Sequence, residues 1–245
     1  MVATIEYIEQ VIKNYEAATA ANLETPSRQG NVIVLNAENA DDVMVTADLH
    51  GMLEDVAKLK AAYPQRVHFL LSNHELAELT EYPILKSNKM LNLMFRLGLQ
   101  EMYGPATEKI RAAYAPFIKS CPLAARVADD IFICHTLPEK VDQRGFDTTV
   151  FERPLEMIDF KEHATVFQLV WGRDFRPENA AAFAKLVDAK ILIHGHEPSP
   201  DGYQVPNDQQ IILDCCTDKG SYLLVPTGES FTHEQLVAKV QPLHA

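Results

Sequence analysis

The sequence lacks an excess of positive charge. Its 22 lysine and arginine residues stand against 34 aspartate and glutamate residues, and the formal net charge is -12 at pH 7. Nucleic acids and anionic membrane surfaces attract basic proteins, so this balance argues against both as partners. An anionic substrate would need local positive charge, supplied by a bound cation or by a few well-placed arginine side chains.

Long apolar runs are absent as well. No stretch approaches the roughly 20 apolar residues that a membrane-spanning helix needs. Glu6 and Glu9 lie near the N-terminus, where a secretory signal would carry lysine residues and an apolar segment. The sequence therefore predicts neither a membrane span nor export.

Cysteine is scarce, with four residues in the chain. None of them shows CxxC spacing, and a framework disulfide between two adjacent cysteines is disfavoured. We therefore expect a cytoplasmic protein with buried, reduced thiols. The four are Cys121, Cys134, Cys215 and Cys216.

The length and composition predict one α/β domain over residues 1–245. A chain of 245 residues with 47% hydrophobic and 23% charged residues can bury a full core. Apolar residues at helical spacing predict a helix over residues 4–24, with Thr4 as its cap. Residues 76–119 are helical in pattern and carry no strand signal. We interpret them as a helical insertion packed on the main domain, with a partner groove around Met94 as the alternative.

Short apolar runs predict the strands of a sheet. They occupy residues 31–35, 43–46, 67–71, 125–128, 131–134, 191–193, 211–213 and 222–225. In α/β proteins the site is usually built at the carboxyl ends of such strands.

Polar side chains with metal-ligating chemistry follow several of these predicted strands directly. Carboxylate oxygens, imidazole nitrogens and amide oxygens together suit Mn²⁺, Fe or Zn²⁺. Taken singly, each residue has a structural explanation as a helix cap or a hydrogen-bonded strand end, and the convergence of all of them favours a metal site. They are Asp48 with His50, Asn73 with His74, His135, and His194 with His196.

Four segments resemble known motifs in the same order. Residues 45–51, VTADLHG, resemble a GDxHG motif, and residues 63–75, YPQRVHFLLSNHE, resemble a YPxxVxxLxGNHE motif. Residues 122–138 are similar to PLAAxV followed by FxxHGGLxP, and residues 195–203 to GHxxxxxGY. These motifs are typical of calcineurin-like metallophosphoesterases, in the branch of the serine/threonine protein phosphatases. The resemblance extends from about residue 31 to residue 226 and implies an α/β fold, a β-sandwich flanked by helices.

The resemblance also implies a metal centre. It implies Mn²⁺, with Fe or Zn²⁺ as alternatives, as one or two divalent ions beside a phosphoprotein or a phosphorylated small molecule. Asp48 and His50 would bind the first metal, and Asn73, His135 and His196 the second.

Two further residues receive catalytic roles from the same resemblance. His74 would protonate the leaving-group oxygen of the phosphoester. Residues 171–174, WGRD, resemble an LWGR segment of bacterial members, in which Arg173 would clamp phosphate oxygens. An ordinary surface arginine is the alternative for Arg173.

One motif of the family is missing from the sequence. GDxxDRG, whose first aspartate bridges the two metals, has no counterpart between Gly51 and Asn73. We interpret the gap as a deletion of one strand-helix unit, which would leave one metal bound firmly or two bound weakly. The alternative alignment makes Asp48 a remnant of the GDxxDRG motif and the opening motif lost, but the DxHG pattern favours the deletion. The sequence thus predicts a metal-dependent phosphomonoesterase. The alternatives are a pseudophosphatase that acts as a binding or scaffold domain, and a purely structural α/β protein.

Overall fold

The computed structural model describes residues 2–48, 51–86 and 88–244. The chain folds into two compact units. The first, here called the helical unit, comprises residues 1–28 and 50–122. The second, the sheet unit, comprises residues 29–49 and 123–245. The prediction of one domain over the whole chain stays a prediction, and each unit is described by itself.

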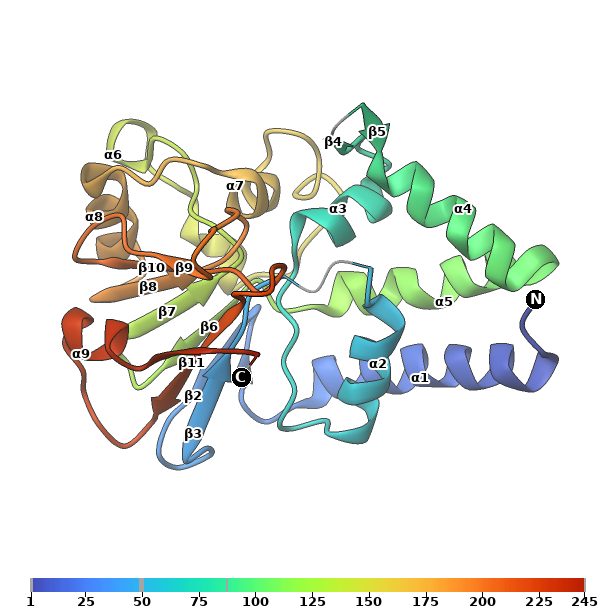
Figure 1. Ribbon diagram of the computed structural model, residues 1–245, viewed down its shortest axis with the longest axis horizontal. Helices are drawn as coiled ribbons and strands as arrows, with labels where there is room; N and C mark the ends of the chain where they lie inside the picture. Colours follow the sequence, from blue (N-terminus) through green and yellow to red (C-terminus); the bar gives the residue numbers. More distant parts are fainter. Residues whose placement is uncertain (1, 49–50, 87, 245) are drawn as a thin grey trace. The chain divides into compact units, whose positions relative to one another are not determined.

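The main sheet of the sheet unit has seven strands and mixed direction (Figure 1). β8 pairs in parallel with both β7 and β10, β2 pairs in parallel with β6, and β6 is antiparallel to β7. In spatial order the strands are β1 (Arg28–Gln29), β2 (Val32–Leu35), β6 (Ala124–Val127), β7 (Ile131–Cys134), β8 (Ile191–His194), β10 (Gln210–Leu213) and β9 (Tyr203–Gln204).

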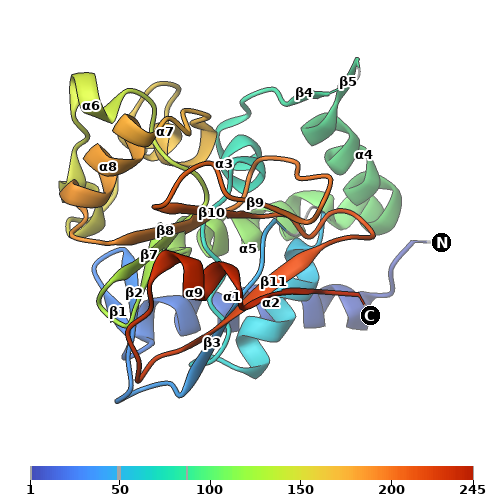
Figure 2. The same ribbon diagram turned by 60° about the vertical axis from the view of Figure 1, so that its left-hand side comes forward.

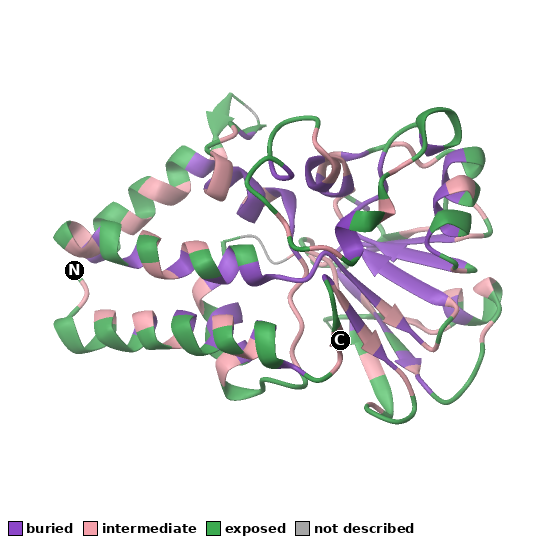
Figure 3. Cartoon of the chain, turned by 180° about the vertical axis from the view of Figure 1, so that it is seen from behind, coloured by how far each residue is buried: buried purple, intermediate pink, exposed green. Residues whose placement is uncertain are grey.

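The central strands of this sheet are apolar and buried on both faces. Every residue of β7, β8 and β10 is buried, as the purple strands in Figure 3 show. Continuous apolar runs of this kind are typical of strands covered on both sides. On one side Phe132 of β7 packs edge-on against Phe151 and Phe183, at centroid distances of 5.4 and 6.0 Å.

Short helices and a second sheet complete the sheet unit (Figure 2). The second sheet has the order β12 (Val240–Pro242), β11 (Ser221–Pro226) and β3 (Asp42–Val45), and both pairings are antiparallel. The helices are α6 (Val141–Arg144), the 3-10 turn η2 (Thr148–Phe151), α7 (Thr165–Trp171), α8 (Pro177–Leu186) and α9 (His233–Val237). A mixed sheet flanked by helices confirms the predicted α/β class.

The helical unit is built around a core of aromatic side chains. Tyr15 of the first helix lies 5.9 Å from both Tyr114 and Phe117 of the last, measured between ring centroids. Thr4 caps the first helix and accepts a hydrogen bond from the Tyr7 backbone at 3.2 Å. The helices are α1 (Ile5–Glu24), α2 (Leu53–Ala62), α3 (Asn73–Thr80), α4 (Leu91–Tyr103), the 3-10 turn η1 (Gly104–Ala106) and α5 (Thr107–Ser120).

Two carboxylates of the helical unit are held by several polar partners. Glu54 accepts hydrogen bonds from the hydroxyl groups of Tyr7 and Tyr103. The bond to Glu54 is the main cause that raises the pKa of Tyr7 to about 12. Glu78 is buried and accepts from Arg96 Nε at 2.9 Å and from the Tyr114 hydroxyl at 2.5 Å. The hydrogen bonds of Glu54 and those of Glu78 each join helices that are distant in sequence, so the role of these two carboxylates is structural.

The structure corrects two predictions about this unit. Residues 67–71 form no strand within the described chain, although their apolar run predicted one. The Leu71 backbone N–H donates to the carbonyl oxygen of Pro122 at 2.9 Å, and no regular ladder extends along the segment. Residues 76–119 were predicted to contain no strand, yet a short hairpin forms there from β4 (Leu85–Lys86) and β5 (Lys89–Met90).

No helix in the described part of the chain is long and apolar enough to cross a membrane.

Candidate metal centre

Three strand ends bring the candidate metal ligands of the sheet unit together. His135 follows β7 directly, and His196 lies two residues after β8. Because β7 and β8 are parallel neighbours with Ile131 opposite Ile191, their carboxyl ends lie at the same edge of the sheet. Asp48 lies three residues after β3, the edge strand of the second sheet.

Asp48, His135 and His196 form one cluster of ligand atoms. Asp48 Oδ1 lies 3.2 Å from His135 Nδ1, and His135 Nε2 lies 3.0 Å from His196 Nδ1. One ligand atom from each residue lies within 4.8 Å of the other two. Among the described residues, these three form the group of acidic, histidine or cysteine side chains whose atoms lie close enough together to coordinate one metal ion.

The donor set suits a divalent transition metal. A carboxylate oxygen and two imidazole nitrogens are ligands for Zn²⁺, Fe and Mn²⁺ alike. His135 is 6% exposed, so its imidazole is held in place by surrounding protein. These residues therefore fit a divalent cation, and their chemistry leaves its identity open.

The backbone around the cluster is adapted to close packing. A Cβ atom at Gly195 would lie 3.1 Å from Asp48 Oδ1, so the glycine leaves room for that carboxylate. The Gly195 N–H donates to the His135 carbonyl at 3.0 Å and joins the two strand ends. His196 has a φ of 69°, a left-handed conformation that non-glycine residues adopt at a cost of about 1 kcal/mol.

Two thiols that the sequence did not assign to the site lie against Asp48. Cys215 Sγ and Cys216 Sγ lie 3.0 and 3.5 Å from the Asp48 carbonyl oxygen, to which both donate. They follow β10, at the same edge of the sheet as β7 and β8. The hydrogen bond from Cys216 lowers the pKa of the Cys215 thiol. Cys216 is exposed and Cys215 half-buried, whereas buried thiols were predicted at all four positions.

His194 has a different environment from His196. It is buried, its Nε2 lies 3.2 Å from Gln210 Oε1, and its ring stacks on Phe175 with centroids 5.4 Å apart. Burial lowers the pKa of His194 to about 4. The His194 side chain is thus a neutral, hydrogen-bonded part of the core, which is the structural alternative considered for such a residue.

The segment after α7 lies beside the cluster. The Trp171 ring faces the His196 ring edge-on, with centroids 6.2 Å apart. Gly172 packs so tightly that a Cβ atom there would lie 1.8 Å from the Leu137 carbonyl oxygen. Arg173 forms an ion pair with Glu197, the residue after His196.

Comparisons with known proteins agree with this architecture. No family model matches the chain. A protein of Encephalitozoon cuniculi (strain GB-M1), named as a probable serine/threonine-protein phosphatase, is 22% identical over 307 residues. That match covers 98% of this chain, which spans 64% of the relative's length. A Saccharomyces cerevisiae protein serine/threonine phosphatase, described as similar to human phosphatase PP5, superposes with a TM-score of 0.70 over 97% of this chain and 90% of its own, at 14% identity.

The chain has the fold of a serine/threonine protein phosphatase. The resemblance stated on the sequence motifs is thereby confirmed. A cold-active protein-tyrosine phosphatase of a psychrophilic Shewanella aligns with a TM-score of only 0.45 over 71% of this chain, at 12% identity.

Two further predicted residues of the phosphatase site belong to the helical unit. Asn73 and His74 begin α3 in the helical unit, where the Ser72 side chain accepts a hydrogen bond from the His74 backbone at 3.2 Å. Their roles as metal ligand and proton donor stay predictions. His50 lies outside the described residues. Glu78, an acid close to His74 in sequence, is engaged by Arg96 and Tyr114.

Proposed function

We propose that the chain is a metal-dependent phosphoric monoester hydrolase. The observation that carries this proposal is the convergence of Asp48, His135 and His196 at one edge of a phosphatase-like sheet. We further propose phosphoserine or phosphothreonine of a phosphoprotein as the substrate, with a phosphorylated small molecule as the alternative. Mn²⁺ as the metal and a cytoplasmic location belong to the same proposal.

The three ligands would hold the cation between two strand ends and the edge of the second sheet. A bound divalent cation supplies positive charge for the phosphoryl oxygens and lowers the pKa of a water molecule. Such local charge is what a protein with a formal net charge of -12 needs to attract an anionic ester.

Arg173 and His74 would complete the chemistry. The Arg173 guanidinium is oriented by Glu197 and can donate two parallel hydrogen bonds to phosphoryl oxygens. His74 is proposed to give a proton to the leaving alkoxide, because an alkoxide leaves poorly without one.

A pseudophosphatase is the second candidate, and one observation favours it. The sequence has no GDxxDRG segment, so the aspartate that would bridge two metals is absent. Two cations a few ångströms apart repel each other strongly without a shared anionic ligand. We therefore propose that the centre holds one metal firmly or two weakly.

Metal content and turnover measured together separate the two candidates. The protein is reconstituted with Mn²⁺, its metal per chain is counted by plasma mass spectrometry, and hydrolysis of p-nitrophenyl phosphate is followed. We expect turnover that falls at least ~100-fold in His74→Asn, because a general acid contributes 100- to 10,000-fold. Arg173→Ala should raise KM and lower kcat at unchanged metal content. A folded, metal-loaded protein without turnover above background would support the pseudophosphatase instead.

A further inference from the structure

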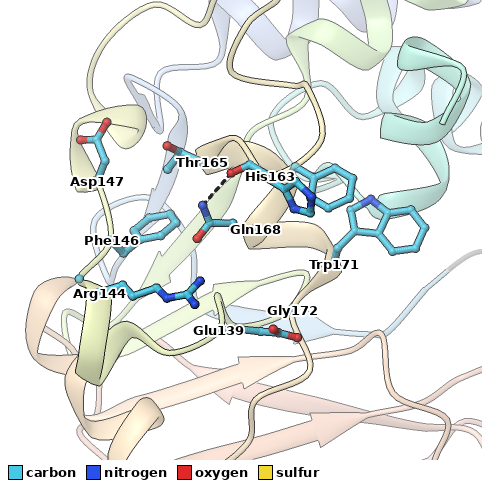
Figure 4. A pocket seen from close by; sticks show the side chains of 11 residues that line it. Glu139, Arg144, Phe146, Asp147, His163, Thr165, Gln168, Trp171 and Gly172 are labelled. Atoms are coloured by element: carbon cyan, nitrogen blue, oxygen red, sulfur yellow. Dashed lines mark hydrogen bonds between the residues drawn. The ribbon is translucent and has the colours of Figure 1, made fainter.

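A cavity of about 770 Å³ opens beside helix α7 in the sheet unit (Figure 4). Its lining comes from α7, from the segment before that helix and from the end of α6 with the residues that follow. One wall is aromatic, because the rings of Phe167 and Trp171 stack with centroids 5.5 Å apart and an interplanar angle of 22°. Phe146 lies on the opposite side of the cavity in Figure 4. These walls favour a flat, apolar group.

One cationic side chain of the cavity wall is available to a ligand. Arg144, the last residue of α6, is exposed and lines the cavity, and no described residue forms a side-chain hydrogen bond or ion pair with it. The two acids of the cavity wall keep their charge, but each is held in place by a hydrogen bond from a backbone N–H. Glu139 Oε1 accepts from the Arg173 backbone at 3.2 Å, and Asp147 Oδ1 accepts from the Thr149 backbone at 3.0 Å. The cavity therefore presents an available guanidinium, which matches a carboxylate.

The cavity and the metal centre share a wall. Trp171 lines the cavity, and its ring also lies edge-on to His196 at 6.2 Å. The tight contact between Gly172 and the Leu137 carbonyl oxygen fixes the end of α7, and with it the position of this tryptophan. Consecutive Cα atoms of a peptide are about 3.8 Å apart, so one to three residues span up to roughly 11 Å, more than the 6.2 Å between the Trp171 and His196 rings.

We infer that this cavity is a substrate subsite for an aromatic side chain that has an acidic neighbour, a few residues from the phosphorylated position. The inference rests on the proposed phosphatase function and specifies its substrate class. The ring of the ligand would lie between Phe146 and the Phe167–Trp171 pair, where aromatic groups pack in stacked or edge-on arrangements. The neighbouring carboxylate would accept hydrogen bonds from Arg144.

Trp171 is the one tryptophan of the chain, so its fluorescence reports on this cavity without any need for turnover. Three phosphoserine peptides are titrated into the full-length protein, with Glu-Phe, Gln-Phe or Ala-Ala beside the phosphoserine. We expect the Glu-Phe peptide to change the Trp171 emission and to bind most tightly. Arg144→Gln should weaken that peptide about 10-fold and leave the Gln-Phe peptide unchanged, since one charge-assisted pair is lost.

Two further variants guard the result against unrelated effects. Arg66→Gln removes an exposed arginine from the helical unit and should leave all three affinities unchanged. Phe146→Leu keeps an apolar side chain beside Phe151 and Phe183 and should weaken both Phe peptides severalfold. Thermal melting checks that each variant is folded.

The outcomes separate this inference from the proposed function. Tight binding of the Glu-Phe peptide without turnover would support the subsite while the hydrolase proposal fails. Turnover with equal kcat/KM for the three peptides, and no change in emission, would overturn the subsite and leave the hydrolase standing. Peptides that neither bind nor turn over would overturn the subsite and the phosphoprotein substrate, and the absence of p-nitrophenyl phosphate hydrolysis as well would overturn the hydrolase.

Discussion

Each unit contains a carboxylate with several polar neighbours, but the chemical type of these neighbours differs between the two units. In the helical unit Glu78 is 6% exposed and faces the guanidinium of Arg96 and the hydroxyl of Tyr114. In the sheet unit Asp48 faces the imidazole of His135, and His196 lies next to that ring. A guanidinium is always charged and neutralises a carboxylate by itself. Imidazole nitrogens and carboxylate oxygens together are ligands for a cation.

The comparison teaches that a polar cluster does not indicate function by its presence alone. The Glu78 cluster has its own positive charge and joins three helices, so it serves the fold. The Asp48 cluster brings together a carboxylate oxygen and imidazole nitrogens at the edge of a sheet. All of these atoms can offer a lone pair to a cation, so a bound cation would complete the cluster. The predictions below test whether this difference is as sharp as the geometry indicates.

The largest effect is expected from removing a ligand of the sheet-unit cluster. Asp48→Asn and His196→Ala should each lower the affinity for Mn²⁺ at least ~100-fold, because even residues that only orient a ligand contribute 10- to 100-fold. Isothermal titration calorimetry measures the affinity directly. His244→Asn changes an exposed histidine outside the cluster and serves as the control. Equal affinities in all four proteins would mean that the cation binds elsewhere.

Glu78→Gln should act on stability instead. The loss of this negative charge leaves Arg96 and Arg111, whose side chains are 24% and 28% exposed, facing each other. We expect the free energy of unfolding to fall by about 2 kcal/mol, below the 3–5 kcal/mol of a fully buried pair because both arginines reach solvent. Urea denaturation measures the change.

The chain offers a matched control for that variant. Glu81 contacts Arg96 at 3.2 Å, but its side chain is 70% exposed. Glu81→Gln should therefore change the free energy of unfolding by less than about 0.5 kcal/mol. A drop in Mn²⁺ affinity in the Glu78 variant would show that the two clusters are not separate in function.

A smaller effect should appear in the pH dependence of stability. Burial lowers the pKa of His68 in the helical unit from 6.5 to about 4, and its Nδ1 is buried without a hydrogen-bond partner among the described residues. Between these two pH values the unfolded chain binds a proton at this histidine and the folded chain does not. The free energy of unfolding should therefore fall as the pH drops from 6.5 toward 4, by about 2 kcal/mol between pH 6.5 and 5.

His68→Leu should remove most of this slope, and urea denaturation at a series of pH values measures it. His163→Leu, which replaces a histidine whose side chain is 86% exposed, should leave the slope unchanged. An unaltered slope in the His68 variant would assign the acid sensitivity to other groups.

The smallest effect concerns the thiols. Cys121 and Cys134 are buried, and burial raises the pKa of both, whereas the pKa of Cys215 is lowered and Cys216 is exposed. A chromogenic disulfide reagent should modify two thiols about 10-fold faster than the other two, because the thiolate is the reacting form. Cys215→Ser and Cys216→Ser identify the fast pair. Four equally slow thiols would contradict the exposure at the metal centre.

Much of the sheet unit was predictable because its apolar runs are short and continuous. The runs at residues 131–134 and 191–193 correspond to β7 and β8, and the position of His135 after β7 follows from them. The run at residues 67–71 looks the same in sequence but forms no ladder, since a strand also needs a partner with free backbone groups. Local composition does not contain that information.

The site was predictable in part for similar reasons. Sequence motifs pointed to Asp48, His135 and His196, and the GHxxxxxGY pattern assigned the metal to His196 rather than to His194, two residues before it. The structure adds that His194 is held in the core, where its ring contacts Gln210. Cys215 and Cys216 were interpreted as buried thiols, because only the return of the chain after β10 brings them to Asp48.

The left-handed backbone of His196 lowers the stability of the fold, while its imidazole is a candidate metal ligand. Glycine adopts a φ near 69° without steric penalty, so glycine in place of His196 would relieve the backbone while it removes a candidate ligand. Selection for thermal resistance alone would therefore favour replacing this histidine. In a library of variants, selection for stability should enrich glycine at position 196, and selection for metal binding should enrich histidine there. Stabilising designs for this protein are therefore best made with residue 196 unchanged.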